Sequence, residues 1–350
     1  MMSSDLGWQA VQEVLGRFPR ASLAQFPTPL WELRNLSQRL GGPRIFLKRD
    51  DLTGFALGGS KARMLEFHMG DAKRRSCDVA VLLASAQSNY CRQLAAAASM
   101  LGMETVLLFG STGGEEIQGN LLLDKLLGAE IRYVDPIEDF FSEEGIKKFD
   151  EVHREVVQDL FRKGHRPVVI DKIYRTSVWS IAGTIHCAAE TAQQLSERNL
   201  AADHFYVPLG SGATFNGIFL GMKASGLPTE VVGVVCGSKR EGRREALAKR
   251  ASEAAKRLGL PVEATPDELV LLHGFAGEEH WSPSEEGIEA IKLVARTEGI
   301  FLDPVYSSKA MAALMDQIRK GRIGQDKTVV LLHTGGTPTL YAFAKDMVDS

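Results

Sequence analysis

The sequence predicts an α/β protein with two domains, each a mostly parallel open sheet with helices on both faces. Short apolar runs alternate with helical patterns through nearly all of the 350 residues. The runs are apolar at consecutive positions, which is typical of parallel strands buried on both faces. Three of them lead directly into polar or glycine-rich corners, and parallel α/β proteins bind ligands at such carboxyl ends of strands. The length suggests two domains, or one large domain with an insertion.

Six apolar runs are predicted as strands, and the segments between them as helices. The predicted strands are 79–85, 105–109, 131–134, 205–209, 231–236 and 328–333. The helical segments include 90–102, 120–128, 180–195 and 287–299.

Composition narrows the class of protein. The net charge is −3, so the chain has no overall basic signature for nucleic acid. The basic run 239–250 is interpreted as a solvated helix face, because glutamates and apolar residues interrupt it. The four cysteines lie far apart without a CxxC pair, which predicts neither a zinc site nor a disulfide framework. We therefore expect no metal. The N-terminal segment has no apolar signal core and no apolar run reaches membrane-spanning length, so we expect a cytoplasmic protein.

The segment GFALGGSKARMLEF, residues 54–67, places Lys61 where a helical pattern begins. Met64, Leu65, Met69 and Ala72 follow at helical spacing and predict one buried face. The helix dipole disfavours a cation at this end. Lys61 is therefore either a surface lysine after a glycine turn or a lysine that acts as a neutral amine.

A second corner, GSGATFNG at 210–217, combines three glycines with two hydroxyl residues between a strand and a helix. Backbone N–H groups in such a turn converge on an anion. The spacing matches neither GxGxxG nor a nucleoside triphosphate loop, which favours a small phosphate monoester over a dinucleotide. The alternative is a strand–helix turn without a ligand.

Three further segments carry polar groups. Gln87, Ser88, Asn89 and Tyr90 stand at a helix start, where a serine or asparagine caps the helix or the group binds a carboxylate. Thr334 ends a predicted strand. The segment DPVYSSKA contains Tyr306, which is either a core residue or an acid–base group.

Five segments occur in the order of one known family. They read FLKRDDL…GGSKARMLEF, QSNYCRQLAAAASMLGM, GSGATFNGIFLG, DPVYSSKAM and HTGGTPTLYAF. The chain resembles the pyridoxal-phosphate enzymes that comprise 1-aminocyclopropane-1-carboxylate (ACC) deaminase and D-cysteine desulfhydrase, of the tryptophan synthase β-like fold. The resemblance covers roughly residues 25–345, and the combination of segments is specific although each alone is not.

The resemblance implies a role for each corner. Lys61 would form a Schiff base with pyridoxal 5′-phosphate and move a proton at the substrate α-carbon, which requires a neutral amine. Tyr306 would be a second catalytic residue, and Thr334 or Ser307 would face the pyridine nitrogen. The other implied residues bind phosphate (Gly210, Ser211, Gly212, Ala213 and Thr214), the pyridine O3′ (Asn89) and substrate (Gln87, Ser88 and Tyr90).

Departures from the family bear on the substrate. ACC deaminase carries a glutamate after the DPVY tyrosine and a tyrosine in a FAYPEYG-like segment, whereas this chain has Ser307 and Gly277. D-cysteine desulfhydrase has a hydroxyl residue directly after the DPVY tyrosine, and Ser307 matches this. The resemblance therefore favours elimination over opening of a cyclopropane ring.

Two altered segments lie on the substrate side. Arg175, in DKIYRTSVWS, is either a surface arginine or a ligand for a second acidic group, which would suit a cysteate-like substrate. His280, in FAGEEHW, is either a substrate contact, an acid–base group or an exposed loop residue.

We therefore expect a large cofactor-binding domain formed by 1–61 and 175–350, and a small inserted domain at 62–174. The cofactor and substrate would lie in the cleft between them, and the resemblance implies a homodimer. The expected reaction is α,β-elimination from a small amino acid, led by D-cysteine and followed by cysteate. The alternatives are ACC deamination and a catalytically inactive pyridoxal-phosphate or amino-acid binding module.

Overall fold

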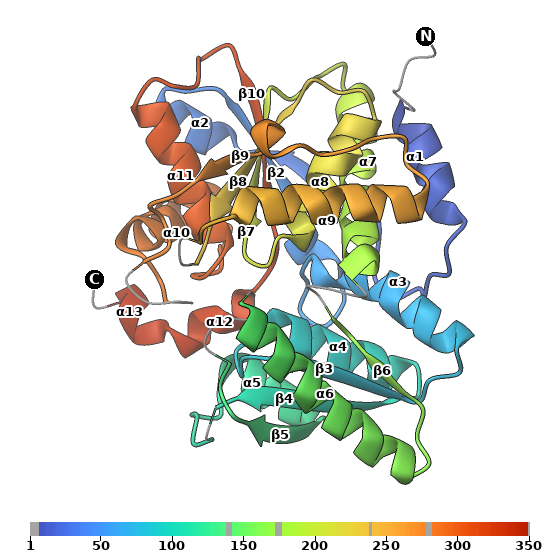
Figure 1. Cartoon of the computed structure of the whole chain (residues 1–350). Helices are drawn as coiled ribbons and strands as arrows, with labels where there is room; N and C mark the ends of the chain where they lie inside the picture. The colour runs from blue at the N-terminus through green and yellow to red at the C-terminus, as the bar shows by residue number, and fades with distance from the viewer. Residues whose placement is uncertain are drawn as a thin grey trace.

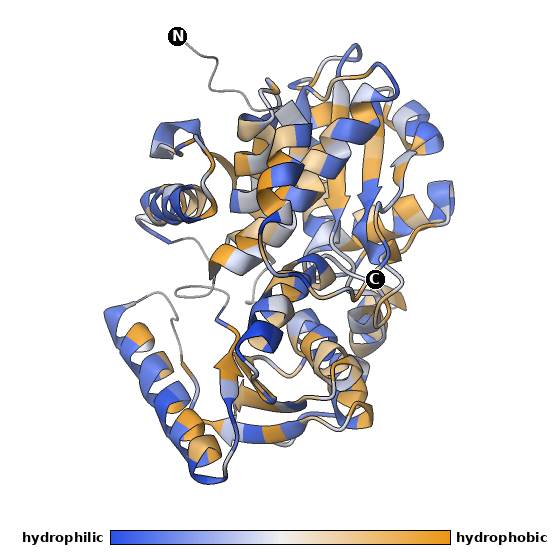
Figure 2. Ribbon diagram, turned by 90° about the vertical axis from the view of Figure 1, so that its right-hand side faces the viewer, coloured by the Kyte–Doolittle hydropathy of each residue, from blue (hydrophilic) through white to orange (hydrophobic). Residues whose placement is uncertain are grey.

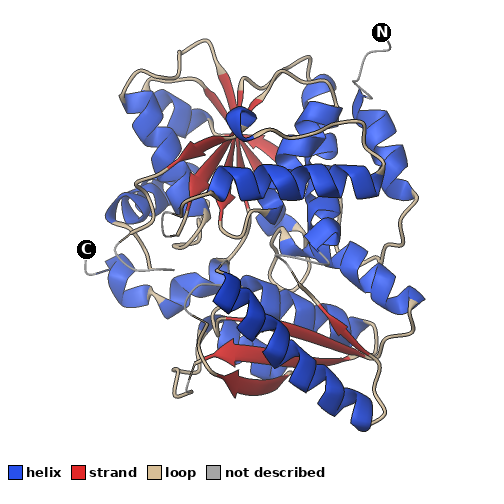
Figure 3. Cartoon of the chain, in the orientation of Figure 1, coloured by secondary structure: helices blue, strands red, loops and turns tan. Residues whose placement is uncertain are grey.

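The computed structural model describes residues 7–111, 113–137, 142–171, 177–237, 240–277 and 282–348. Among these residues the strands form two sheets with helices packed around them (Figures 1 and 3). The six-stranded sheet has the order β1-β2-β10-β7-β8-β9, and the four-stranded sheet has the order β5-β4-β3-β6. β1 pairs antiparallel with β2, and the other pairings are parallel. The predicted α/β class with mostly parallel sheets is confirmed.

The six-stranded sheet contains β1 (Leu30–Glu32), β2 (Arg44–Arg49), β7 (His204–Leu209), β8 (Glu230–Val235), β9 (Val270–Leu272) and β10 (Thr328–His333). The four-stranded sheet contains β3 (Val79–Ala84), β4 (Glu104–Gly110), β5 (Glu130–Val134) and β6 (Pro167–Val169). All six predicted strands are present, each within one residue at either end. β1, β2, β6 and β9 were not predicted.

The helices before β7 are α1 (Gly7–Gly16), α2 (Arg34–Leu40), α3 (Lys61–Arg74), α4 (Asn89–Met100), α5 (Gly119–Leu126), α6 (Glu143–Arg162) and α7 (Ser177–Ser196). Those after β7 are α8 (Ala213–Ala224), α9 (Arg243–Leu258), α10 (Glu285–Glu298), α11 (Ser307–Arg319), α12 (Thr337–Ala342) and α13 (Ala344–Val348). Two short 3₁₀ helices are η1 (Asp50–Leu52) and η2 (Pro266–Glu268). The four predicted helical segments correspond to α4, α5, α7 and α10.

One apolar core joins the two sheets. It includes Phe46 and Phe205 of the six-stranded sheet and Leu82 and Leu107 of the four-stranded sheet, together with residues of the helices between them. In Figure 2 the strands are largely hydrophobic, and the helices alternate apolar and polar positions. This continuous core holds the two sheets against the same helices.

Helix α3 differs from its prediction. It begins at Lys61 as expected, but every residue from Ala62 to Ala72 is buried, so the helix has no solvent-facing side there. The reason is that α3 packs against both α7 and α4. Because α3 is buried on all sides, neighbouring helices hold it in place, and with it Lys61 at its start.

The basic run at 239–250 is only partly a solvated face. In α9, Arg244 and Lys249 are exposed as predicted, but Leu247 is buried, and Arg243 and Arg250 are half-buried. Within the described ranges, no helix has both the length and the apolarity needed to cross a bilayer.

Candidate active site

Three glycine-rich or polar corners follow three neighbouring strands of the six-stranded sheet, β2, β10 and β7. The corner after β2 runs through η1 to Lys61, the corner after β10 contains Thr334, and the corner after β7 contains Gly210. Because these strands are parallel, their carboxyl ends lie at the same edge of the sheet.

The corners after β2 and β10 are in backbone contact. The N–H of Ser60 donates to the carbonyl of Thr334, with 3.0 Å between nitrogen and oxygen. Gly335 has a φ of +85°, and a Cβ there would lie 2.5 Å from Cα of Gly59. No side chain fits between the two corners, so glycine at 335 brings Lys61 next to the end of β10.

Two further segments meet at this edge. A Cβ on Gly336 would lie 2.9 Å from Nδ2 of Asn89 and 2.7 Å from Cβ of Asp303. A Cβ on Gly210 would lie 3.2 Å from Cε1 of Tyr306. All five segments that were singled out in the sequence therefore converge, between the two sheets of Figure 1.

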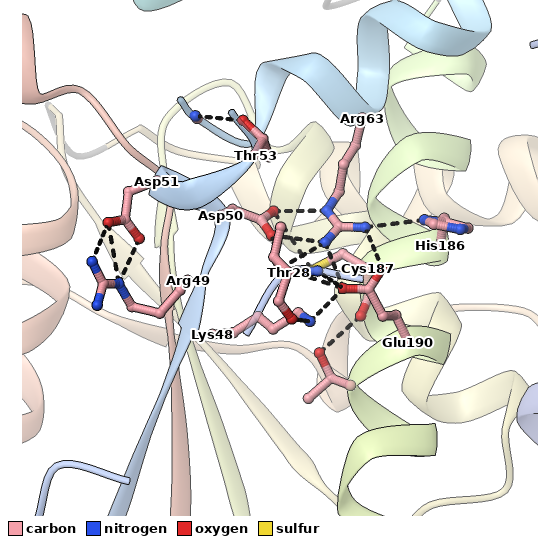
Figure 4. A network of polar contacts seen from close by, with 12 residues as sticks. Thr28, Lys48, Arg49, Asp50, Asp51, Thr53, Arg63, His186, Cys187 and Glu190 are labelled. Carbon is pink, nitrogen blue, oxygen red and sulfur yellow. Dashed lines mark hydrogen bonds and ion pairs between the residues drawn. The ribbon is translucent and has the colours of Figure 1, made fainter. Parts of the chain in front are cut away.

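A buried cluster of charges holds the first turn of α3 (Figure 4). The guanidinium of Arg63 donates to Oδ1 of Asp50 and to Oε1 of Glu190, each at 2.8 Å. Lys48 forms an ion pair with the same glutamate. The cluster ties β2, η1 and α7 to α3, so it fixes the position from which Lys61 extends.

The cluster is balanced, with two cations and two carboxylates. Burial would raise the pKa of Glu190, but Arg63 and Lys48 hold it well below its ordinary range. Burial and Arg63 lower the pKa of His186, which lies beside the guanidinium, to about 3. His186 is therefore neutral, and the charges of the cluster compensate one another.

The QSNY corner begins α4. Ser88 is the N-cap, and its hydroxyl accepts from the N–H groups of Tyr90 at 3.2 Å and Cys91 at 3.4 Å. The capping interpretation is therefore correct. A serine hydroxyl accepts two hydrogen bonds and donates one, so its donor proton is directed away from the helix.

The amides on either side of Ser88 contact the start of α5. Asn120 donates from Nδ2 to Oδ1 of Asn89 at 2.9 Å, and its N–H donates to Oε1 of Gln87 at 2.9 Å. Gln87 in turn donates to the carbonyl of Gln118 at 3.0 Å. With its oxygen held in this way, Asn89 presents Nδ2 towards Gly336.

Tyr90 lies away from these partly exposed groups. Its side chain is buried, and its hydroxyl lies 3.1 Å from Oγ of Ser180, which also contacts Nε2 of His68 at 2.9 Å. Burial raises the pKa of Tyr90 and lowers that of His68 to about 3, so both are neutral.

The DPVYSS segment is organised by Asp303. Its buried carboxylate accepts from the N–H groups of Val305 at 3.0 Å, Tyr306 at 2.8 Å and Ser307 at 2.7 Å. The hydroxyl of Ser307 also donates to this carboxylate. Burial, with Cys236 and Asp303 nearby, raises the pKa of Tyr306 well above its ordinary value. Tyr306 is therefore a protonated phenol at neutral pH.

The corner at 210–214 has the shape of an anion site. Gly212 has a φ of +104° and precedes the first turn of α8, so successive N–H groups turn towards one point. Gly210, Ser211 and Thr214 are partly exposed, whereas the remaining residues of the loop are buried. These features fit a phosphate group.

Two predicted residues, Arg175 and His280, lie outside the described residues, as does Lys172. The structure adds others that sequence reasoning missed, namely Asp303, Asn120 and the charges around Arg63. The run KRDD, which spans the end of β2 and the start of η1, was the available signal for the last group, because four consecutive charges follow a short apolar stretch.

Comparison with known proteins decides the family. Residues 21–335 match the family described as pyridoxal-phosphate dependent enzymes. The chain belongs to this family. Its cofactor, predicted from the sequence, is thereby confirmed as pyridoxal phosphate, and the residues of the 210–214 corner and Lys61 fit it.

Relatives within the family agree with the resemblance stated above. D-cysteine desulfhydrase of Yersinia enterocolitica is 35% identical, over 95% of this chain and 98% of the relative. D-cysteine desulfhydrase of Serratia proteamaculans is 33% identical over the same shares. A crystal structure titled as an ACC deaminase homologue has a TM-score of 0.84 and 32% identity, and it covers 97% of this chain and 98% of its own.

Proposed function

We propose that this family member is a lyase that performs α,β-elimination on a small amino acid, with D-cysteine as the leading substrate. The substrate α-carbon loses its proton, the β-substituent leaves with its bonding electrons, and water releases pyruvate and ammonia. When bound, pyridoxal phosphate supplies an electron sink for the electrons left at the α-carbon. The observation that carries the proposal is the convergence of Lys61 with the four other segments at one edge of the sheet.

Lys61 is the lysine that we assign to the cofactor and to the α-proton. Besides Lys61, two lysines among the described residues are of interest because they are fully buried. Lys48 is paired with Glu190, and Lys309 donates to the carbonyls of Cys236 and Ala276. Lys61 is partly exposed at the edge where the segments meet, which supports its assignment.

Other groups at this edge would bind the cofactor and the substrate. The backbone of 210–214 would bind the phosphate, and Nδ2 of Asn89 would donate to the pyridine O3′. The donor proton of Ser88, reinforced by the start of α4, suits the substrate carboxylate. Tyr306, as a neutral phenol, would give a proton to the leaving group.

Contacts favour Thr334 over Ser307 beside the pyridine nitrogen. Both side chains are buried, but the Ser307 hydroxyl donates to Asp303, whereas Thr334 lies in the corner whose backbone contacts Ser60, next to Lys61. A hydroxyl there leaves the ring nitrogen largely unprotonated, which suits elimination.

The position of Gly277 favours elimination over ACC deamination. Gly277 has a φ of +84°, and a Cβ there would lie 2.8 Å from the carbonyl oxygen of Pro283. The tyrosine that the resemblance gives to ACC deaminase at this position does not fit this backbone. An acidic group after Tyr306 is also missing, because Ser307 stands there.

The remaining features are proposals of the same kind. The strands of the four-stranded sheet fall within 62–174 and those of the six-stranded sheet outside it, which supports the inserted-domain division. Substrate roles for Gln87, Arg175 and His280, a homodimer and a cytoplasmic location rest on the family resemblance and the sequence. The resemblance also gives Tyr90 a substrate role, but its buried contact with Ser180 favours a supporting role instead.

The test compares wild type with Lys61→Ala and with Lys73→Ala, an exposed lysine on the same helix. Each protein is loaded with cofactor and offered a panel of D- and L-amino acids and ACC. We expect Lys61→Ala to lose both the visible absorbance of lysine-bound cofactor and keto-acid release, and Lys73→Ala to retain both. Turnover by Lys61→Ala, or 2-oxobutyrate from ACC as the main wild-type product, contradicts the proposal.

A further inference from the structure

Two arginines of α9 contact the back of the 210–214 corner. Nη2 of Arg243 donates to the carbonyl of Gly210 at 2.9 Å, and Nη2 of Arg250 donates to the carbonyl of Ser211 at 3.0 Å. Both arginines belong to the basic run that the sequence suggested was a solvated face. They are half-buried, whereas Arg244 on the same helix is exposed.

These contacts determine which way the loop N–H groups face. A trans peptide unit is planar, and its C=O and N–H point in opposite directions. Because Arg243 holds the carbonyl of Gly210, the N–H of Ser211 faces the other side of the loop. Because Arg250 holds the carbonyl of Ser211, the N–H of Gly212 faces that side as well.

Helix α9 also closes the back of the loop sterically. A Cβ on Gly212 would lie 2.3 Å from Cδ2 of Leu247 and 3.0 Å from Nη2 of Arg250. An anion that binds these two N–H groups therefore approaches from the face opposite α9.

The loop lacks positive charge of its own. Residues 210–217 contain no lysine or arginine, although a phosphate monoester carries up to two negative charges. Burial, followed by the nearby charges of Arg240 and Arg250, lowers the pKa of Arg243 to about 10. The guanidinium is still charged at neutral pH, and these positive charges repel one another. A bound anion in front of the loop relieves that repulsion.

We propose that Arg243 and Arg250 are positioning residues for the cofactor phosphate, which fix the two peptide units of the loop and supply the positive charge behind it. The inference rests on the proposed function in one respect, the placement of the phosphate at 210–214. It concerns affinity for the phosphate group and not the chemistry at the α-carbon.

The experiment measures the binding of two probes to the full-length chain freed of cofactor. Pyridoxal 5′-phosphate carries the phosphate, and pyridoxal carries the same ring and aldehyde without it. Arg243→Met and Arg250→Met remove a guanidinium but keep an aliphatic stem, and Arg243→Lys keeps the charge without the planar donor group. Arg244→Met and Lys249→Met are matched controls that remove one charge from the exposed side of α9.

We expect Arg243→Met and Arg250→Met each to raise the Kd of pyridoxal 5′-phosphate by about ten- to hundredfold, the loss of a charge-assisted hydrogen bond. The Kd of pyridoxal stays unchanged, and Arg243→Lys falls between wild type and Arg243→Met. The two control variants change the Kd of pyridoxal 5′-phosphate by less than about threefold, because exposed charges are screened.

Unchanged affinity for pyridoxal 5′-phosphate in both methionine variants overturns the proposal, and so does an equal loss of affinity for both probes. If Arg243→Met does not fold, as its melting curve without cofactor reports, Arg250→Met and Arg243→Lys decide. A wild type that binds the cofactor tightly but eliminates nothing from any amino acid contradicts only the proposed function. A wild type that does not prefer the phosphorylated probe contradicts the placement of the phosphate on which both depend.

Discussion

Replacement of Arg63 by methionine tests whether the buried charge cluster holds the start of α3. The Arg63 side chain is fully buried, and so is Asp50, while the side chain of Glu190 is 5% exposed. Methionine fills much of the same volume but leaves Asp50 without a cationic partner among the contacts described above, since Lys48 pairs with Glu190. Removal of one partner from a buried ion pair costs about 3–5 kcal/mol.

That magnitude is large beside the whole stability of a folded protein, which is about 5–15 kcal/mol. The assay is urea unfolding at neutral pH, followed by circular dichroism. Arg74→Met is the matched control on the same helix, because Arg74 pairs with Asp71 at 2.6 Å but its side chain is 65% exposed. An exposed pair contributes less than about 1 kcal/mol.

A second substitution separates charge from packing. Asp50→Asn added to Arg63→Met removes the uncompensated charge, so it should recover part of the lost free energy of unfolding. If Arg63→Met costs no more than Arg74→Met, the cluster does not hold α3. If the double variant is no more stable than Arg63→Met, the loss comes from packing and the electrostatic reasoning is wrong.

Three other substitutions test separate parts of the account. Gly335→Ala places a Cβ 2.5 Å from Gly59, and we expect thermal melting to show a loss of at least about 1–3 kcal/mol; a stable variant would refute the close approach. Ser307→Ala should cost about 1–2 kcal/mol, because the hydroxyl donates to Asp303, yet leave the absorbance of bound cofactor unchanged. The pKa of His68 is lowered from 6.5 to about 3 by burial, so its neutral form stabilises the fold fully above pH 6.5, and this contribution is lost as the pH falls towards 3. Between pH 6 and 4, denaturant titrations should therefore show wild-type stability falling more steeply than that of His68→Gln, by about 1.4 kcal/mol per pH unit; equal slopes would contradict the assignment.

Regular strands were predictable because their signal is local. The stretches 79–84 and 329–332 are apolar at every position, and both lie in strands of the structure, β3 and β10. β2 was not predicted, although it lies inside the six-stranded sheet, because Lys48 and Arg49 interrupt its apolar run. Both charges are buried, and the partner of Lys48, Glu190, comes from a distant segment that no local pattern contains, whereas Arg49 pairs with the nearby Asp51.

The sequence predicted the corners at the strand ends of the candidate site, but not the residues that hold those corners in place. Glycines and hydroxyls after strands predicted Lys61, Gly210 and Thr334 as candidate site residues, because a turn that approaches a ligand requires those residue types nearby. The role of Asp303 depends on backbone N–H groups of the following turn, and the role of Arg250 depends on α9 packing against a loop more than thirty residues earlier. Such roles arise from tertiary contacts, so residue type and spacing do not reveal them.

The central claim is that Lys61 carries the cofactor at the edge where the five segments meet. The most direct measurement is borohydride reduction of the holoenzyme, followed by proteolysis and mass spectrometry to locate the pyridoxyl group. The account predicts a modified peptide that contains Lys61, and none that contains Lys48 or Lys309. A pyridoxyl group on either of those buried lysines, or on a surface lysine with Lys61 unmodified, would contradict it.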